Sequence, residues 1–335
     1  MKIVMIGNTN VGKTTYMASL YGIMQQQIEG FSLKAVNGND RSRLHELAQA
    51  ISQGHYPSST AQRGEYDFFL QYQNKDTFAF RWADYRGGAI RETQSSDEAN
   101  LLIKDLREAD GIMMFCDCDA LIRGDTRANE IRRMTILVTQ ALKDVEKPIS
   151  LAIILSKADK ISHFQEKLIS PFQGLIGVIN ASKWVIGAFI PIACGNQFMN
   201  VPIPLLFTLY AAVYVQAFTA QKAAEESYNR AIAWQEKSQG LTGFFRWAGD
   251  TWSGNPTDEQ LAQKELAASV EHYQKFEFIK DPVLALSNYL ENIPWIQEDK
   301  TLLAYSQSCA KLKFYHHFSG ELNRKGRDPF ELFLL

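Results

Sequence analysis

The sequence predicts an α/β fold, in which helices cover both faces of a mostly parallel sheet and a helical extension follows. Short apolar stretches alternate with helical patterns through about the first 195 residues, which is typical of parallel strands joined by helices. Beyond Asn200 the strand signals end and polar, alanine-rich helical patterns replace them. The expected strands are 2–6, 66–72, 78–83, 111–116, 150–155 and 185–193, and the expected helices are 13–27, 41–53, 98–109 and 128–143.

One pair of these strands is expected to be antiparallel. The residues QNKD, at 73–76, lie between strands 66–72 and 78–83 and are typical of a hairpin turn. We therefore place this pair at one edge of the sheet.

The extension is expected to contain a long antiparallel helical hairpin. Helical patterns run over 204–237 and 257–278, and Thr257 with the two acidic residues after it forms a good helix start. At 335 residues the chain exceeds the roughly 100–200 of a typical domain. We divide it into a first domain at 1–200, a hairpin at 201–280 with a tip loop at about 240–256, and helices at 281–335 that pack back on the first domain.

Charge and hydropathy exclude some partners. The chain has 35 basic and 37 acidic residues and no long run of one sign, so no nucleic-acid partner is expected. Its first residues run directly into a strand without a cleavable signal, which indicates a cytoplasmic protein. Residues 201–220 approach the roughly 20 apolar residues that span a bilayer. Because prolines and asparagines interrupt this region, we expect a buried helix instead.

The tip loop offers a contact surface. Residues 243–252 hold four large aromatic side chains within a short, glycine-containing stretch. Such clusters usually mark contact with a protein or with the interfacial zone of a membrane, and folding back on the hairpin is the alternative. Contact with a protein partner is the preferred interpretation.

Residues 7–14 read G-x-x-x-x-G-K-T and lie between an apolar strand and a helix. This pattern predicts a phosphate-binding loop, because glycines let backbone amides converge on phosphate oxygens at the start of a helix. Lys13 would reach the β and γ phosphates, and the Thr14 hydroxyl would bind Mg²⁺. The other expected nucleotide-binding residues of this segment are Asn8, Asn10, Val11, Gly12 and Thr15.

Two further motifs follow at strand ends. Asp84 and Gly87 form an Asp-x-x-Gly sequence, in which the carboxylate would hold a magnesium-bound water and the glycine amide would contact the γ phosphate. Ser156, Lys157 and Asp159 end another apolar strand and resemble the N/T/S-K-x-D guanine signature of GTPases. The resemblance implies that Asp159 accepts two hydrogen bonds from the N1 and N2 groups of guanine. Adenine has no such donor pair. Cys194 lies in the loop expected to back the base.

These motifs, in this order, resemble those of P-loop GTPases of the Ras-like, translation-factor-related class, with their three-layer sandwich. The runs GKTTY and LY at 12–21, PSST at 57–60 and NVPIPLL at 200–206 also resemble the bacterial double-GTPase family. The resemblance implies GTP and GDP as ligands, Mg²⁺ as cofactor, and Thr60 as a switch residue that binds Mg²⁺ when a γ phosphate is present. It also implies a place in a conflict or defence system beside a second GTPase and an associated protein.

The chain departs from the GTPase pattern at two positions. Ser156 stands where asparagine or threonine is usual, which loosens the network around the base and leaves ATP use open. Gly88 stands where many small GTPases carry a water-positioning glutamine, so slow hydrolysis is expected. Arg86 or Arg91 is a candidate charge-stabilising finger, with an activating partner as the alternative source.

Three functions stay open at this point. The first is a GTP-hydrolysing switch with a low intrinsic rate and nucleotide-dependent partner binding. The second is a mechanochemical GTPase peripheral to a membrane, which contacts the bilayer through 243–252. The third is a nucleotide-sensing scaffold that binds GTP and hardly hydrolyses it. A homo-oligomer is compatible with each of them.

Overall fold

The computed structural model describes residues 1–58, 63–91, 97–143, 145–195, 197–238, 256–298, 300–312 and 315–316. Two compact units make up the chain, one from Met1–Ala212 with Leu286–Leu335 and the other from Val213–Ala285. The expected switch residue Thr60 and the aromatic tip residues 243–252 lie outside the described residues.

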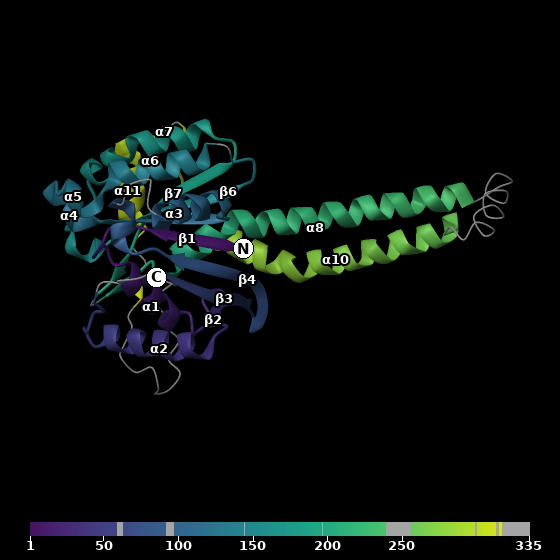
Figure 1. Ribbon diagram of the computed structural model, residues 1–335, viewed down its shortest axis with the longest axis horizontal. Helices are drawn as coiled ribbons and strands as arrows, with labels where there is room; N and C mark the ends of the chain where they lie inside the picture. The colour runs from purple at the N-terminus through teal and green to yellow at the C-terminus, as the bar shows by residue number, and fades with distance from the viewer. Residues whose placement is uncertain are drawn as a thin grey trace. The chain divides into compact units, whose positions relative to one another are not determined.

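A seven-stranded sheet forms the first unit, in the order β2-β3-β4-β1-β5-β6-β7 (Figure 1). Strand β1 pairs in parallel with β4 and β5, and the parallel ladder continues through β6 to β7. Strands β2 and β3, and β3 and β4, are antiparallel. The strands are β1 Lys2–Ile6, β2 Phe31–Ala35, β3 Gly64–Tyr72, β4 Lys75–Asp84, β5 Gly111–Asp117, β6 Ile149–Ser156 and β7 Val185–Pro191.

Helices cover both faces of this sheet. On one face Val4 and Ile6 of β1 belong to the same apolar cluster as residues of α3 (Asp97–Glu108) and α6 (Ile131–Leu142). On the other face Tyr16 of α1 (Lys13–Ile23) contacts the rings of Trp82 and Phe115. Because β1 is buried on both sides, it reads as a continuous apolar run. The predicted mostly parallel α/β fold is confirmed.

The structure corrects several predicted boundaries. Strand β2 (Phe31–Ala35) was not predicted, and it replaces the β3–β4 pair at the sheet edge. Helix α1 ends at Ile23 instead of 27, because the chain then turns through Gly30, at φ 83°, into β2. The predicted helix 128–143 begins only at Ile131, since Glu130 adopts a left-handed conformation. Two short helices precede it, α4 Cys118–Arg123 and α5 Thr126–Asn129.

The end of the predicted strand 185–193 also differs. Strand β7 stops at Pro191, and Ala193–Cys194 (β8) joins Phe198–Met199 (β9) and Tyr315–His316 (β10) in a small antiparallel sheet. The remaining elements of this unit are α2 Gly38–Ser52, α7 Gln173–Ala181, α11 Leu302–Lys311 and four short 3-10 helices, η1 Gly87–Arg91, η2 Ala158–Lys160, η3 Glu166–Leu168 and η4 Ser170–Phe172.

Helix α8 (Pro202–Ser238) begins inside the first unit. Its first turns are buried there, and the Leu205 amide donates a hydrogen bond to the Tyr16 hydroxyl at 3.1 Å. A Cβ on Gly111 of β5 would lie 2.3 Å from the Thr208 side chain, so this glycine permits the close approach of helix and sheet. Among the described residues, α8 is the one helix whose length and apolar content would suffice to cross a membrane, and 56% of its most apolar window is buried.

The second unit is an antiparallel pair formed by the rest of α8 and by most of α10 (Asp258–Tyr289). The Ser269 hydroxyl donates to the Ala224 carbonyl at 3.0 Å, and Arg230 pairs with Glu265 at 3.0 Å. Helix α10 starts with a reciprocal cap, in which the Gln260 amide donates to the Thr257 hydroxyl and the Thr257 amide donates to the Gln260 side chain. The polar pattern that predicted a helix start here therefore has a direct structural basis.

Candidate functional site

The loop between β1 and α1 has the shape that its glycines allow. Gly12 has a φ of 94°, a conformation that favours glycine, and it precedes the first residue of α1. The Lys13 ammonium folds back and donates to the Gly7 and Asn8 carbonyls at 2.6 and 3.1 Å. Lys13 is only 7% exposed, and this burial lowers its pKa to about 8. A phosphate group would give this buried cation an anionic partner.

Asp84 ends β4 beside the same loop, where β4 pairs in parallel with β1. The Asp84 residue is 3% exposed, and its Oδ1 atom has no hydrogen-bond partner among the described residues. Burial raises the Asp84 pKa to about 6, and the positive charge of Lys13 opposes this rise. A buried carboxylate oxygen without a partner fits the predicted role in holding a cation or its water.

Gly87 lies directly against the phosphate loop. A Cβ at this position would lie 2.0 Å from the backbone nitrogen of Thr9 and 2.4 Å from the Thr9 hydroxyl oxygen. Any side chain here would therefore displace one of the two loops. Gly87 and Lys13 line the same cavity.

The third motif follows β6, at the opposite end of the site. The Ser156 hydroxyl lies 2.7 Å from the Val11 carbonyl and 3.0 Å from the Cys116 carbonyl, so it connects this strand to the phosphate loop. Lys157 has a left-handed backbone, and its ammonium pairs with Asp117 at 2.5 Å. A Cβ on Gly195 would lie 3.1 Å from Asp159 Oδ2, which brings the β8 loop against this carboxylate.

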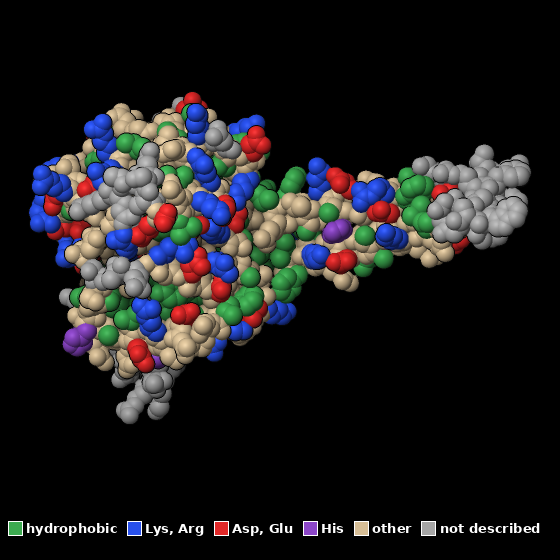
Figure 2. All heavy atoms as spheres, viewed as in Figure 1, with side chains coloured by type: hydrophobic (Ala, Val, Ile, Leu, Met, Phe, Trp, Pro, Cys, Tyr) green, Lys and Arg blue, Asp and Glu red, His purple; other side chains and the backbone are tan. Residues whose placement is uncertain are grey.

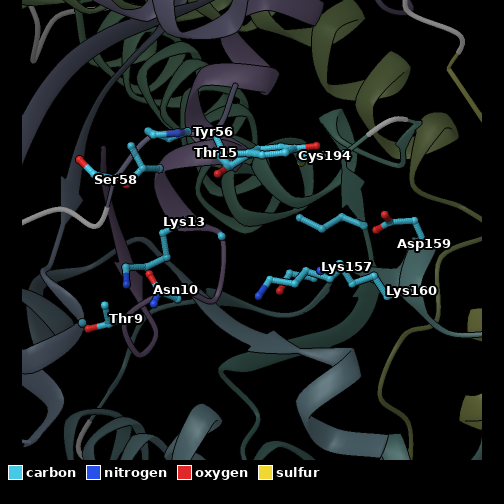
Figure 3. Close-up of a pocket in the computed structure, with 17 residues that line it drawn as sticks. Thr9, Asn10, Lys13, Thr15, Tyr56, Ser58, Lys157, Asp159, Lys160 and Cys194 are labelled. Atoms are coloured by element: carbon cyan, nitrogen blue, oxygen red, sulfur yellow. The ribbon is translucent and has the colours of Figure 1, made fainter. Parts of the chain in front are cut away.

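One cavity of about 320 Å³ joins the three motifs (Figure 3). Figure 3 shows Thr9, Asn10 and Lys13 together at one end, and Lys157, Asp159 and Lys160 at the other. The sequence-predicted residues that line it are Asn10, Gly12, Lys13, Thr14, Thr15, Gly87, Ser156, Lys157, Asp159 and Cys194. A cavity with a phosphate loop at one end and an acceptor carboxylate at the other is shaped for a nucleotide.

Four predicted residues do not line this cavity. The Asn8 amide donates to the Arg127 and Ala128 carbonyls, both at 2.9 Å, and therefore ties the loop to α5. Val11 is buried, and its carbonyl lies beside Ser156. Asp84 is buried and is not among the residues that line the cavity. The Arg86 guanidinium is bound to Glu98 Oε2 at 2.6 Å.

Several lining residues were not predicted, and Tyr56 is the largest of them. Burial, followed by the negative charge of Asp159, raises the pKa of its hydroxyl. The available signal is an aromatic residue directly before the PSST segment at 57–60. The others are Thr9, Pro57, Ser58, Lys160, Ile192 and Gly195.

A buried carboxylate on α3 holds both chain segments that flank the phosphate end. Asp105 Oδ2 accepts hydrogen bonds from the Tyr85 hydroxyl and from Arg63 Nη2, each at 2.6 Å, and Oδ1 accepts one from Lys2 at 2.6 Å. The Arg63 guanidinium also lies 5.0 Å from the centre of the Tyr85 ring. These partners hold the pKa of Asp105 below its usual value, although burial alone would raise it. Tyr85 directly follows Asp84, so α3 anchors that segment.

The fold and this cavity define a P-loop GTPase. The family model Double-GTPase 1 matches residues 4–157, which include the phosphate loop, Asp84, Gly87 and Lys157. The matched part, residues 4–157, is that of a P-loop GTPase of the double-GTPase type, and the predicted class is confirmed. A search of curated proteins finds no match.

The chain is also similar to three proteins of known structure. The mammalian SRP receptor shares 12% identity over 58% of this chain and 93% of its own, with a TM-score of 0.36. The GTP-bound GTPase-like domain of S. cerevisiae Ski7 shares 18% identity over 58% of this chain and 42% of its own, with a TM-score of 0.38. A GDP- and AlF4⁻-bound variant of S. thermophilus NFeoB shares 11% identity over 92% and 97%, with a TM-score of 0.35.

The shifted pKa values predict an unusual pH dependence of the nucleotide-free protein. The folded-state pKa of Asp84, about 6, lies above its usual 3.8, so the folded protein binds this proton more strongly. The contribution of Asp84 to stability therefore falls as pH rises from about 4 to about 6. Lys13, at about 8, lies below its usual 10.5, so its contribution recovers as pH rises from about 8 to about 10.5. Urea unfolding of the wild type and of Asp84→Asn across this range measures the first contribution as the difference, and a pH-independent difference would contradict it.

Proposed function

We propose that this chain is a Mg²⁺-dependent GTP switch with a low intrinsic rate of hydrolysis, and that its bound nucleotide controls contact with a protein partner. Binding and hydrolysis of GTP follow from the family. The rate, the metal, the partner and the biological setting are the proposed parts.

The observation that carries the proposal is the single cavity that connects Lys13 with Asp159. Lys13 would bind the β and γ phosphates, and the amides at the start of α1 would surround them. Asp159 would accept hydrogen bonds from guanine, while the stem of Lys157 lies along the base. Gly87 would offer its backbone amide to the γ phosphate. Water then attacks the γ phosphorus, and GDP leaves with its terminal oxygen carrying the bond's electron pair.

The residues present fit a magnesium ion. Thr14 and Asp84 would hold it, with Thr60 as a third ligand in the GTP state. Asp84 supports this assignment because its buried Oδ1 has no partner among the described residues. When bound, Mg²⁺ neutralises charge on the phosphates. Charge repulsion between Asp84 and the phosphates then no longer opposes GTP binding.

The sequence and geometry around the phosphates support slow turnover. Gly88 has no side chain to position the attacking water. Arg86, the candidate finger, is bound to Glu98 Oε2 and does not line the cavity. Hydrolysis would therefore accelerate when a partner supplies a cation or when Arg86 leaves Glu98. The lack of a water-positioning side chain at Gly88 also supports the second candidate, a scaffold that binds GTP and hardly hydrolyses it.

The biological setting rests on the family resemblance. We infer a cytoplasmic protein that acts in a bacterial conflict or defence system, with a second GTPase or an activating protein as its partner. The mechanochemical alternative needs membrane contact through residues 243–252. Liposome binding that requires Trp247 or Trp252 would favour that alternative.

Asp159→Ala tests the guanine assignment. We expect the preference for GTP over ATP to disappear, with a loss of GTP affinity of at least about 100-fold, because two hydrogen bonds to the base are lost. Titration calorimetry with GTP, GDP and ATP in the presence of Mg²⁺ measures this change. Asp119→Ala, at an exposed acid of α4, is the matched control. A guanine preference that survives in Asp159→Ala would remove the basis for the assignment.

A further inference from the structure

The two helices of the second unit contact each other mainly through small side chains. The buried positions of α8 in this unit include Ala217, Ala224, Ser227 and Ala231, and Ser269 of α10 packs against them. These positions follow the alternating spacing of four and three residues that is typical of packed helices. We call this line of contact the seam. The larger apolar side chains that are buried in this unit are Val213, Ile279 and Val283.

Other large apolar side chains of this unit lie one residue after the seam. Phe218 follows Ala217, Tyr228 follows Ser227, and Val270 follows Ser269. We call seven exposed side chains the apolar face, and each is between 39% and 58% exposed: Phe218, Tyr228, Ile232, Leu266, Val270, Tyr273 and Leu284. Tyr214 and Phe278 are further exposed apolar residues of this unit. Exposed hydrophobic and charged side chains are both visible on the described part of the hairpin (Figure 2).

Helix geometry places these residues on one side of the hairpin. Each step along an α-helix turns the side chain by about 100° in the same sense around the helix axis. Because α8 and α10 run in opposite directions, one step forward from the seam turns both helices toward the same side. The seven side chains therefore share a single face.

The opposite side of the hairpin is mostly polar, and Phe278, one step before buried Ile279, is its exposed apolar residue. Glu226 and Arg230 lie one step before seam residues of α8, and Lys264, Glu271 and Lys275 lie one step before half-buried residues of α10. They form ion pairs along the surface, such as Lys275 with Glu271 at 2.8 Å. The hairpin thus has one solvated face and one apolar face, which is the pattern of helices that pack on a further layer.

We propose that the apolar face docks with the same face of a second copy of this chain, so that two hairpins form a four-helix bundle. The exposed parts of the seven side chains amount to about 700 Å² per copy, close to the roughly 800 Å² that each partner buries in a stable interface. Leu266, Val270 and Tyr273 have the four-and-three spacing that fits another helix. A second copy offers this surface with two-fold symmetry, which closes the assembly as a dimer.

The charge of the hairpin favours a protein over a membrane as occupant. Its described residues include nine acidic and six basic side chains. A helix pair that lies on an anionic membrane usually carries lysine and arginine in excess beside its apolar face. The net negative charge here would oppose such contact.

Sedimentation of the full chain tests this proposal. We expect the wild type to form a dimer at concentrations between about 1 and 100 µM. Tyr228→Glu with Val270→Glu adds two charges to the apolar face. We expect the dissociation constant of the dimer to rise by at least about 100-fold in this variant. Gln216→Glu with Ala233→Glu adds the same charges one step before the seam, at exposed positions, and should leave the dimer unchanged.

Circular dichroism checks that all three proteins keep their helices, and GTP affinity should be equal among them, which separates this test from that of the nucleotide site. A wild type that stays monomeric at about 100 µM contradicts the proposal. A dimer that persists in Tyr228→Glu with Val270→Glu would place the interface elsewhere. Binding of a monomeric wild type to phosphatidylserine vesicles, lost in that variant, would assign the face to lipid.

Discussion

Replacing Gly87 with alanine is expected to lower the rate of GTP hydrolysis by at least about 100-fold, because removing one transition-state contact typically has an effect of this size. The added methyl would lie 2.0 Å from the backbone nitrogen of Thr9 and 2.5 Å from the carbonyl carbon of Asn8. Backbone atoms cannot rotate away as a flexible side chain can. The segment after Asp84 must therefore retreat from the phosphate loop, and its contact with the γ phosphate is lost.

The affinity for GDP should change little in this variant, since GDP has no γ phosphate to meet the displaced segment. Single-turnover hydrolysis and GDP titration separate the two effects. Gly88→Ala is the matched control, because its added methyl would meet only the end of the Arg86 side chain, at 3.3 Å. If Gly87→Ala hydrolyses GTP as fast as Gly88→Ala, the segment does not contribute to catalysis through its approach to Thr9.

Asp84→Asn is expected to have opposite effects on folding and on nucleotide binding. The variant removes a buried charge whose Oδ1 has no partner among the described residues, so the nucleotide-free protein should gain about 1–3 kcal/mol at pH 7. It also removes the anionic ligand proposed for Mg²⁺. The increase in GTP affinity that Mg²⁺ brings should therefore fall by at least about tenfold.

Urea unfolding without nucleotide and GTP titration with and without Mg²⁺ measure the two effects. Asp67→Asn is the control, since Asp67 is an exposed acid paired with Arg81 on β3 and β4. A variant that is less stable than the wild type would show that Asp84 contributes to folding. A magnesium effect of wild-type size would show that the metal is held without this carboxylate.

The nucleotide motifs could be predicted because each is local in sequence. The loop at 7–14 needs only glycines, a lysine and a following helix, and all of them are adjacent in the chain. Asp84 and Asp159 could be placed because parallel strands bring their carboxyl ends to one edge of a sheet. The cavity that joins Lys13 to Asp159 therefore followed from the order of the motifs.

Features that depend on distant contacts escaped this reasoning. Strand β2 (Phe31–Ala35) is five residues long and has a lysine at its fourth position, so its pairing with β3 is not visible in its own sequence. The Asn8 side chain donates to the carbonyls of Arg127 and Ala128, and these distant partners lie within reach only after folding. Tyr56 was missed for the same reason, since nothing near it in sequence identifies Asp159 as its neighbour.

The bonds of Asp105 have a consequence for how the two segments behave together. Tyr85 and Arg63 donate hydrogen bonds to the same oxygen of this carboxylate. They belong to two separate chain segments that flank the phosphate end of the cavity. A shared acceptor makes the two donors interdependent, since either one binds more strongly once the other has gone. Through Asp105, helix α3 therefore couples Tyr85 to Arg63, so a change in one of these hydrogen bonds would change the strength of the other.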